Sequence, residues 1–212
     1  MTLITIFSFL GIIAAAVSGT LVGMKKQMDL FGLIFLAAAT SLGGGVIRDI
    51  MIGHFPPVVF IKPIYFLVST LAALVTCFFY ERITKLQNTI MLSDAVGLGV
   101  FTAIGANAAV SQDLLNAPFL VVSMGLLTGI GGGILRDLFA KDIPYVFRKE
   151  IYAIASILGA LSFLFTYDKV PHVLSFYICL LVTFVVRVVA VMYNVNFPVF
   201  RTEQPKGLSQ KS

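Results

Sequence analysis

Apolar residues fill seven segments of the 212-residue chain, and short polar stretches separate them. A segment of about 20 apolar residues is long enough to cross the hydrocarbon core of a bilayer as a helix. The strands of a membrane β-barrel would instead alternate apolar and polar positions over about ten residues, and the sequence has no such pattern. The pattern predicts an all-α integral membrane protein with seven transmembrane helices, at residues 3–23, 30–53, 58–80, 90–110, 117–140, 151–167 and 173–195.

Composition and charge agree with that class and indicate an orientation. Hydrophobic residues make up 58% of the chain and charged residues 12%, which leaves too little polar surface to coat a soluble domain. Most of the 15 lysine and arginine residues fall on one side of the membrane if the N-terminus is outside. The positive-inside rule then predicts a multi-pass protein of the cell inner (cytoplasmic) membrane with a cytoplasmic C-terminus. This bias accounts for the net charge of +5, so nucleic acid is not needed as a partner.

One motif occurs twice, near the ends of the second and fifth apolar segments. It reads TSLGGGVIRD at residues 40–49 and TGIGGGILRD at residues 128–137. A glycine inside a helix costs about 1 kcal/mol relative to alanine, and an ionisable side chain at membrane depth costs roughly 3 kcal/mol. Residues of this kind in a membrane indicate a functional site by default.

The similarity between the two halves extends beyond this motif. At an offset of 88, Gly11 matches Gly99; after one deletion, Ser69 matches Ser156. Each unit holds three helices, an odd number, so the second unit must enter the membrane from the opposite face. Inverted repeats of this kind build transport proteins, with the pathway at the repeat interface. The predicted divisions are a first repeat at 1–88, a second, inverted repeat at 89–170, a seventh helix at 171–195 and a polar cytoplasmic tail at 196–212.

The two glycine runs are expected to kink their helices near the bilayer centre. A bend there frees backbone groups, which membranes tolerate only where protein buries them or water reaches them. The alternative is close helix packing, because glycine lets two backbones approach. We predict that the pore and gate are formed by Thr40, Ser41, Gly43, Gly44, Gly45, Arg48, Asp49, Thr128, Gly131, Gly132, Gly133, Arg136 and Asp137.

The charged residues of the motif need partners. Neighbouring residues on a helix do not face each other, so Arg48 should not pair well with Asp49, nor Arg136 with Asp137, unless the helix has ended there. We expect partners from the other repeat or from the following turns. These charges either line or gate a pathway or form a purely structural set. Arg187, within the last helix, is expected to snorkel to the cytoplasmic headgroups.

No cofactor, resident metal or catalytic set is expected. Cys77 and Cys179 fall inside apolar spans, where cysteine behaves as a small hydrophobic residue. His54 and His172 lie at predicted helix ends without cysteine or carboxylate at ligand spacing. The glycine runs lack the Gly-Lys-Ser/Thr of a nucleotide loop. We therefore do not expect an enzyme.

Two stripes of small residues predict close helix contacts, either inside one protomer or between subunits. Their positions are Gly11, Ala15 and Gly19 on the first helix and Ala95, Gly99 and Ala103 on the fourth.

The duplicated Gly-Gly-Gly-x-x-Arg-Asp on the second and fifth of seven helices resembles the prokaryotic branch of the trimeric intracellular cation (TRIC) channel family. The resemblance covers residues 1 to about 195. It implies a homotrimer in which each protomer has its own potassium-permeable pore. The chain also resembles related bacterial inner-membrane proteins labelled as probable glycine transporters. The acidic residue Asp94 has Ile6 as its counterpart in the first repeat, so a role for that carboxylate is not expected to be symmetric.

These observations predict a monovalent cation channel lined by Thr40, Ser41, Thr128 and backbone carbonyls, with selectivity from oxygen dipoles. The alternative is a carrier for glycine or a similar small amino acid, in which helix N-termini face the carboxylate of the substrate. A scaffold whose repeats merely pack together is the third possibility.

Overall fold

The computed structural model describes residues 3–85, 88–112, 115, 117–148 and 151–193, and these residues form helices and turns without strands. The helices of this part of the chain are α1 (Leu3–Lys25), α2 (Leu30–Met51), α3 (Val58–Ile61), α4 (Ile64–Phe78), α5 (Tyr80–Thr84), α6 (Thr89–Val110), α7 (Pro118–Phe139), α8 (Tyr145–Arg148), α9 (Ile151–Thr166) and α10 (His172–Met192). The predicted tail at 196–212 lies outside the described residues.

The starts of the two motif-bearing helices follow from local sequence. Asp29 caps α2, and its carboxylate accepts a 2.7 Å hydrogen bond from the backbone N–H of Gly32. An N-cap carboxylate of this kind satisfies one of the amides that a helix leaves unpaired at its start. Pro118 occupies the first turn of α7, where its missing N–H removes no helical hydrogen bond.

Five helices, α1, α2, α6, α7 and α10, are long and apolar enough to cross a membrane. The apolar helices α4 and α9 are shorter, with 15 and 16 residues. The predicted helix at 58–80 is interrupted, because Pro63 separates α3 from α4. Proline lacks the backbone N–H that would continue the helix and disfavours helical geometry in the residue before it.

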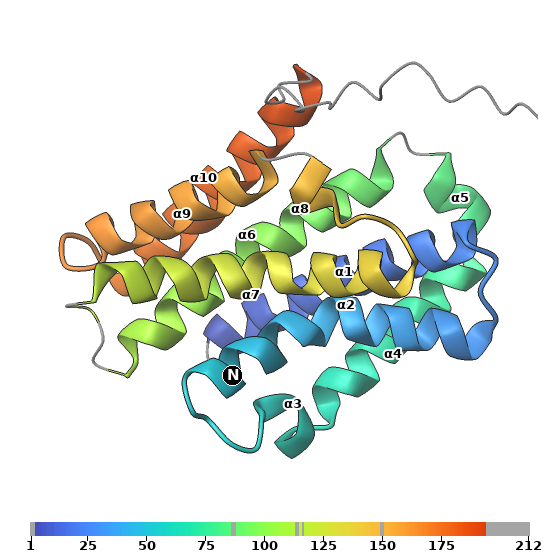
Figure 1. Cartoon of the computed structure of the whole chain (residues 1–212), viewed down its shortest axis with the longest axis horizontal. Helices are drawn as coiled ribbons and strands as arrows, with labels where there is room; N and C mark the ends of the chain where they lie inside the picture. The colour runs from blue at the N-terminus through green and yellow to red at the C-terminus, as the bar shows by residue number, and fades with distance from the viewer. Residues whose placement is uncertain (1–2, 86–87, 113–114, 116, 149–150, 194–212) are drawn as a thin grey trace, which may run out of the picture.

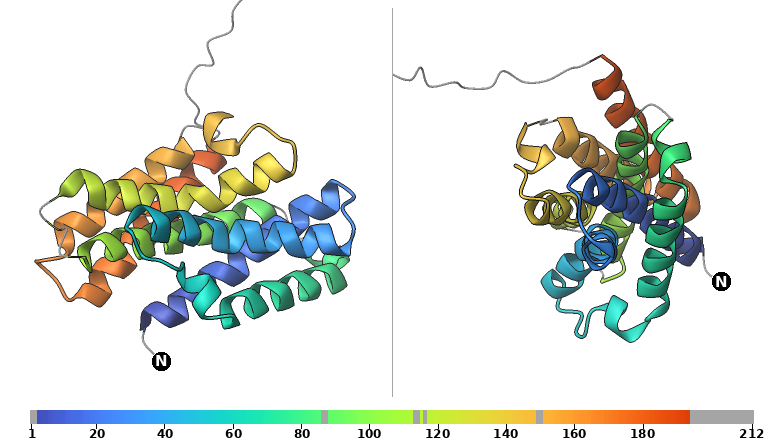
Figure 2. Two further views of the ribbon diagram at one scale, coloured as in Figure 1. Left: turned by 60° about the horizontal axis from the view of Figure 1, so that its bottom comes forward. Right: turned by 90° about the vertical axis from the view of Figure 1, so that its right-hand side faces the viewer.

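Four helices form the centre of the molecule. Helix α7 packs against α2 and α6, and α1 packs against the same two helices. Helix α4 covers α1 and α2, whereas α9 and α10 pack on the other side, on α6 and α7 (Figure 1). Figure 2 shows the same four central helices flanked by α4, α9 and α10 from two further directions. Both motif-bearing helices therefore belong to this central group of four and pack against each other.

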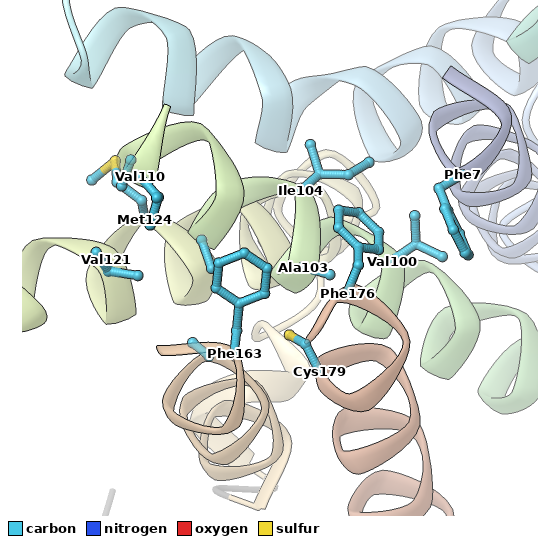
Figure 3. Packing of buried hydrophobic residues seen from close by; sticks show 13 residues of the cluster. Phe7, Val100, Ala103, Ile104, Val110, Val121, Met124, Phe163, Phe176 and Cys179 are labelled. Atoms are coloured by element: carbon cyan, nitrogen blue, oxygen red, sulfur yellow. The ribbon is translucent and has the colours of Figure 1, made fainter. Parts of the chain in front are cut away.

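The largest apolar cluster lies where α6, α7, α9 and α10 meet (Figure 3). Phe163 of α9 and Cys179 of α10 are fully buried there, beside Ala103 of α6. Cys179 and the half-buried Cys77 are free thiols.

The small residues of α1 and α6 make contacts within the protomer. A Cβ added to Gly11 would lie 2.8 Å from the Cγ1 of Val100 on α6, and one added to Gly99 would lie 3.0 Å from the carbonyl oxygen of Leu180 on α10. Gly19 lies against Thr40 of α2. The remaining small residues of the two stripes are buried: Ala15, Ala95 and Ala103.

Candidate functional site

The two glycine runs meet where α2 crosses α7. A Cβ added to Gly44 would collide with the carbonyl oxygen of Thr128, and one added to Gly132 would collide with the carbonyl oxygen of Thr40. Both obstacles are backbone atoms, which cannot rotate away as a side chain can. The middle glycine of each run therefore lets the two helix backbones touch.

The kinks expected at the glycine runs stay a prediction, because a helix can bend without a break in its helical residues. Helices α2 and α7 continue without interruption through Gly43–45 and Gly131–133. Glycine permits helical geometry as well as bends. Thr40 and Thr128 are buried at this contact, and each hydroxyl donates a 2.6 Å hydrogen bond to the carbonyl four residues earlier.

The first and third glycines of each run have different surroundings. Gly43 lies against the side chain of Leu135, and a Cβ on Gly131 would lie 3.2 Å from the Cα of Gly44. A Cβ on Gly45 would instead have only Arg48 Nη2 within 4 Å, at 3.9 Å. Its counterpart Gly133 lies against the hydroxyl of Tyr152. The helix contact thus depends on the first two glycines, and the third faces the arginine of its own motif.

A chamber of about 390 Å³ lies at the end of the bundle where α1 ends and α6 begins. We call it the Arg136 chamber. Its lining includes Lys25 from α1, Asp94 from α6, Arg136 from α7 and Arg187 from α10. Four helices therefore place ionisable side chains at one site.

Arg136 is the most connected of these side chains. Its Nη1 donates to the Oδ1 of Asp94 and, at 2.8 Å, to the hydroxyl of Ser18 on α1. Its Nε donates to the Oδ1 of Asp137 at 2.8 Å. The other oxygen of Asp137 accepts the backbone N–H of Tyr145, 2.7 Å away, so this carboxylate also holds the start of α8. Charged partners and hydrogen bonds of this kind offset the cost of burying an arginine.

A second chamber, of about 300 Å³, lies at the opposite end, where α1 begins and α6 ends. We call it the Arg48 chamber. Ser41, Gly45, Arg48 and Asp49 are among its lining residues. Ser41 donates a 2.8 Å hydrogen bond to Ser69 of α4. Thr40 and Thr128 are not among the residues that line either chamber.

Arg48 and Asp49 repeat the geometry of the second motif with fewer partners. Arg48 donates from Nε and Nη2 to the Oδ1 of Asp49, at 2.9 and 2.7 Å. The other carboxylate oxygen of Asp49 accepts the backbone N–H of Val58 at the start of α3. Each aspartate thus binds its arginine with one oxygen and a following short helix with the other.

The expectation that adjacent Arg and Asp would not pair was wrong in both motifs. Both pairs lie near the end of a helix, and each arginine side chain is long enough to reach the carboxylate of the next residue. Some of the expected outside partners do exist, because Ser18 belongs to the other repeat and the backbone N–H groups of Val58 and Tyr145 follow the turns.

Arg187 does not snorkel to the membrane surface. Its side chain is buried, with 3% of the residue exposed. The guanidinium carbon lies 4.8 Å from the ring centroids of both Tyr145 and Tyr152. Cation–π contact with two rings stabilises the charge within the protein. This contact could not be predicted from the sequence, because the rings come from α8 and α9.

The structure also brings in residues that the sequence reasoning did not assign to the site, namely Ser18, Tyr145 and Tyr152. Asp94 was noted from its asymmetry between repeats, but its pairing with Arg136 was not foreseen. Among the described residues, no group of three or more His, Cys, Asp or Glu side chains is placed to hold a metal ion.

The chain matches a known protein family and several bacterial membrane proteins. The family model described as Glycine transporter matches residues 5–81 and 91–168. The UPF0126 inner membrane protein YadS of Escherichia coli K12 is 35% identical over 193 residues, which cover 89% of this chain and 92% of YadS. A UPF0126 membrane protein of Deinococcus radiodurans is 41% identical over 153 residues, or 71% of this chain and 70% of that protein.

Solved structures are also similar. The TRIC trimeric intracellular cation channel orthologue from Rhodobacter sphaeroides matches with a TM-score of 0.86 and 32% identity, covering 92% of this chain and all of that one. A structure described for conductance through TRIC cation channels matches with a TM-score of 0.86 and 33% identity, covering 96% of this chain and all of that one. The two family matches together span most of the sequence, and so the chain belongs to the glycine transporter family, with the fold of the TRIC cation channels.

Proposed function

We propose that each protomer is a channel for monovalent cations, potassium among them, and that the ion path runs between the two chambers. The observation that carries this proposal is the position of the chambers at opposite ends of α1 and α6, each beside one Gly-Gly-Gly-x-x-Arg-Asp motif. In this proposal the path passes the contact of Gly44 and Gly132 with the opposite backbone, where the two helices lie against each other. The similarity to TRIC cation channels supports the same function.

The two halves of the chain are proposed to be inverted repeats. In support, Lys25 at the end of α1 and Asn88 just before α6 line one chamber, whereas Ser8 and Asn107 from the opposite ends of these helices line the other. The equivalent helices therefore run antiparallel. With seven membrane crossings, the N-terminus would lie outside and the C-terminus in the cytoplasm.

The arginines are compatible with cation permeation because carboxylates accompany them. Arg48 is matched by Asp49, and Arg136 by Asp94 and Asp137. A path between the chambers requires α2 and α7 to separate at the glycine contact. The backbone oxygens of Thr40 and Thr128 then face the opening, where oxygen dipoles replace part of the hydration shell of the ion.

The proposed assembly is a homotrimer in the lipid bilayer. The name of the Rhodobacter sphaeroides relative describes that protein as trimeric. The large apolar side chains that this protomer exposes, such as Phe66 and Leu71 on α4, suit contact with lipid or with a second subunit.

Transport of glycine by a carrier mechanism is the second candidate. The description of the matching family favours it. Two chambers at opposite ends of the bundle also suit alternating access, in which a substrate site opens to one side at a time.

Flux into liposomes that contain the purified protein separates the candidates. We expect potassium uptake down its gradient that rises in proportion to the gradient, with no effect of glycine. Empty liposomes and liposomes with the Gly132→Leu variant are the controls, because the leucine side chain would occupy the space that opens between α2 and α7. Saturable exchange of labelled glycine without potassium flux would support the carrier. Wild-type flux equal to that of empty liposomes would contradict both.

A further inference from the structure

Arg187 is a buried cation that the duplicated motif does not explain. It lies on α10, the helix that follows both repeats, and so has no counterpart in the first repeat. Its Nε is buried and has no hydrogen-bond partner among the described residues. A buried donor without a partner destabilises the protein, and more so when it is charged. The side chain lines the Arg136 chamber, so part of it borders the space that a ligand in that chamber would fill.

The two tyrosines hold Arg187 in a defined orientation. The ring centroids of Tyr145 and Tyr152 are 6.1 Å apart with an interplanar angle of 67°, and each is 4.8 Å from the guanidinium carbon. At these distances the rings form a corner around the guanidinium group and cannot enclose it from two opposite faces. The remaining side of the planar group stays available for an oxyanion, which arginine binds with two parallel hydrogen bonds.

The charges around the chamber define the ligand further. Arg136 already pairs with Asp94 and Asp137. Among the described residues, no carboxylate lies within salt-bridge distance of Arg187 or Lys25. The three cations Lys25, Arg136 and Arg187 line the chamber, and two carboxylates, Asp94 and Asp137, oppose them. The cations therefore exceed the carboxylates by one. This balance fits a singly charged oxyanion.

We propose that the Arg136 chamber binds a small monocarboxylate, whose two oxygens accept hydrogen bonds from the guanidinium group of Arg187. The chamber volume of about 390 Å³ leaves room for such a ligand and its water. Binding itself does not depend on the channel proposal. Where that proposal also holds, the carboxylate neutralises excess positive charge at one mouth of the path, and cation conductance rises.

Thermal unfolding of the purified protein in detergent tests the binding. At constant ionic strength, increasing acetate in place of chloride should raise the unfolding temperature along a saturable curve, because a ligand that binds only the folded state stabilises it. Arg187→Gln should weaken the apparent acetate affinity at least tenfold, and Arg187→Lys should weaken it less. The matched control is Arg82→Gln, since Arg82 is an exposed arginine of α5 that also lies over an aromatic ring, that of Phe79. It should leave the acetate curve unchanged.

Several outcomes overturn the proposal. An acetate response that does not saturate, that chloride reproduces, or that Arg187→Gln leaves unchanged would each exclude the site. Saturation by phosphate but not by acetate would exclude the monocarboxylate. If Arg187→Gln does not fold, the test rests on saturation of the wild-type acetate curve and on weaker acetate affinity in Arg187→Lys. Because unfolding is measured without ion flux, failure of this site is distinguishable from failure of the channel proposal.

Discussion

Replacing Gly44 by alanine should loosen the contact between α2 and α7, whereas replacing the adjacent Gly45 should not. The new methyl group on Gly44 would overlap the carbonyl oxygen of Thr128. The methyl group on Gly45 would have its nearest neighbour, Arg48 Nη2, at 3.9 Å, which is ordinary van der Waals contact. The two positions are adjacent on one helix and receive the same methyl group.

The magnitude follows from two opposing terms. Overpacking costs about 1–3 kcal/mol, and the upper end applies here because the obstacle is backbone. Alanine also stabilises a helix interior by about 1 kcal/mol relative to glycine. We therefore expect Gly44→Ala to lower the free energy of unfolding by about 2 kcal/mol and Gly45→Ala to raise it by about 1 kcal/mol. The helix term cancels in the difference, about 3 kcal/mol, which measures the contact alone.

Unfolding in mixed detergent micelles, followed by far-ultraviolet circular dichroism, measures this difference. Gly132→Ala, which meets the carbonyl oxygen of Thr40, should behave like Gly44→Ala. If Gly44→Ala and Gly45→Ala differ by less than about 1 kcal/mol, below the overpacking range, the close contact between the helices is refuted.

Three further predictions concern the charges and the small residues. Arg136→Ala leaves two carboxylates without their partner and should destabilise the folded protein by about 3–5 kcal/mol. In a double-mutant cycle, adding Asp94→Ala should recover part of this loss, whereas additive effects would argue against the pairing. Arg48→Ala should destabilise the protein less than Arg136→Ala does. The side chain of Arg48 is 14% exposed and pairs with one carboxylate, whereas that of Arg136 is 5% exposed and pairs with two. An equal loss for the two variants in the same unfolding assay would contradict this. A Cβ on Gly97 would lie 3.4 Å from the Cβ of Ala15, which is near the Cβ–Cβ separation in a disulfide. Cysteines introduced together by Ala15→Cys and Gly97→Cys, in a protein that lacks Cys77 and Cys179, should therefore form a crosslink within the monomer. Crosslinked dimers on a denaturing gel would place this contact between subunits instead.

The sequence predicted the helical class and most of the helix positions, because long apolar segments indicate membrane helices regardless of their partners. The break at Pro63 could have been predicted from the same principle, since proline removes a helical hydrogen bond. The shorter lengths of α4 and α9 depend on turns and tertiary contacts, which the sequence pattern does not specify.

The charged residues of the candidate site can be singled out from the sequence, whereas their contacts could not be predicted correctly. The duplicated motif identified Arg48, Asp49, Arg136 and Asp137 without any structure. Their pairing was misjudged because helical periodicity describes Cβ directions, whereas an arginine side chain is long enough to reach a neighbouring carboxylate. The surroundings of Arg187 come from α8 and α9, and only the packed fold brings them to α10.

Single-channel recording tests the central claim most directly. Purified protein in a planar bilayer, with potassium chloride at different concentrations on the two sides, should give discrete currents proportional to voltage. These currents should reverse near the potassium equilibrium potential, and the Gly132→Leu variant, reconstituted in equal amount, should abolish them. Folded wild-type protein that passes no current while exchanging labelled glycine in a saturable manner would contradict the account.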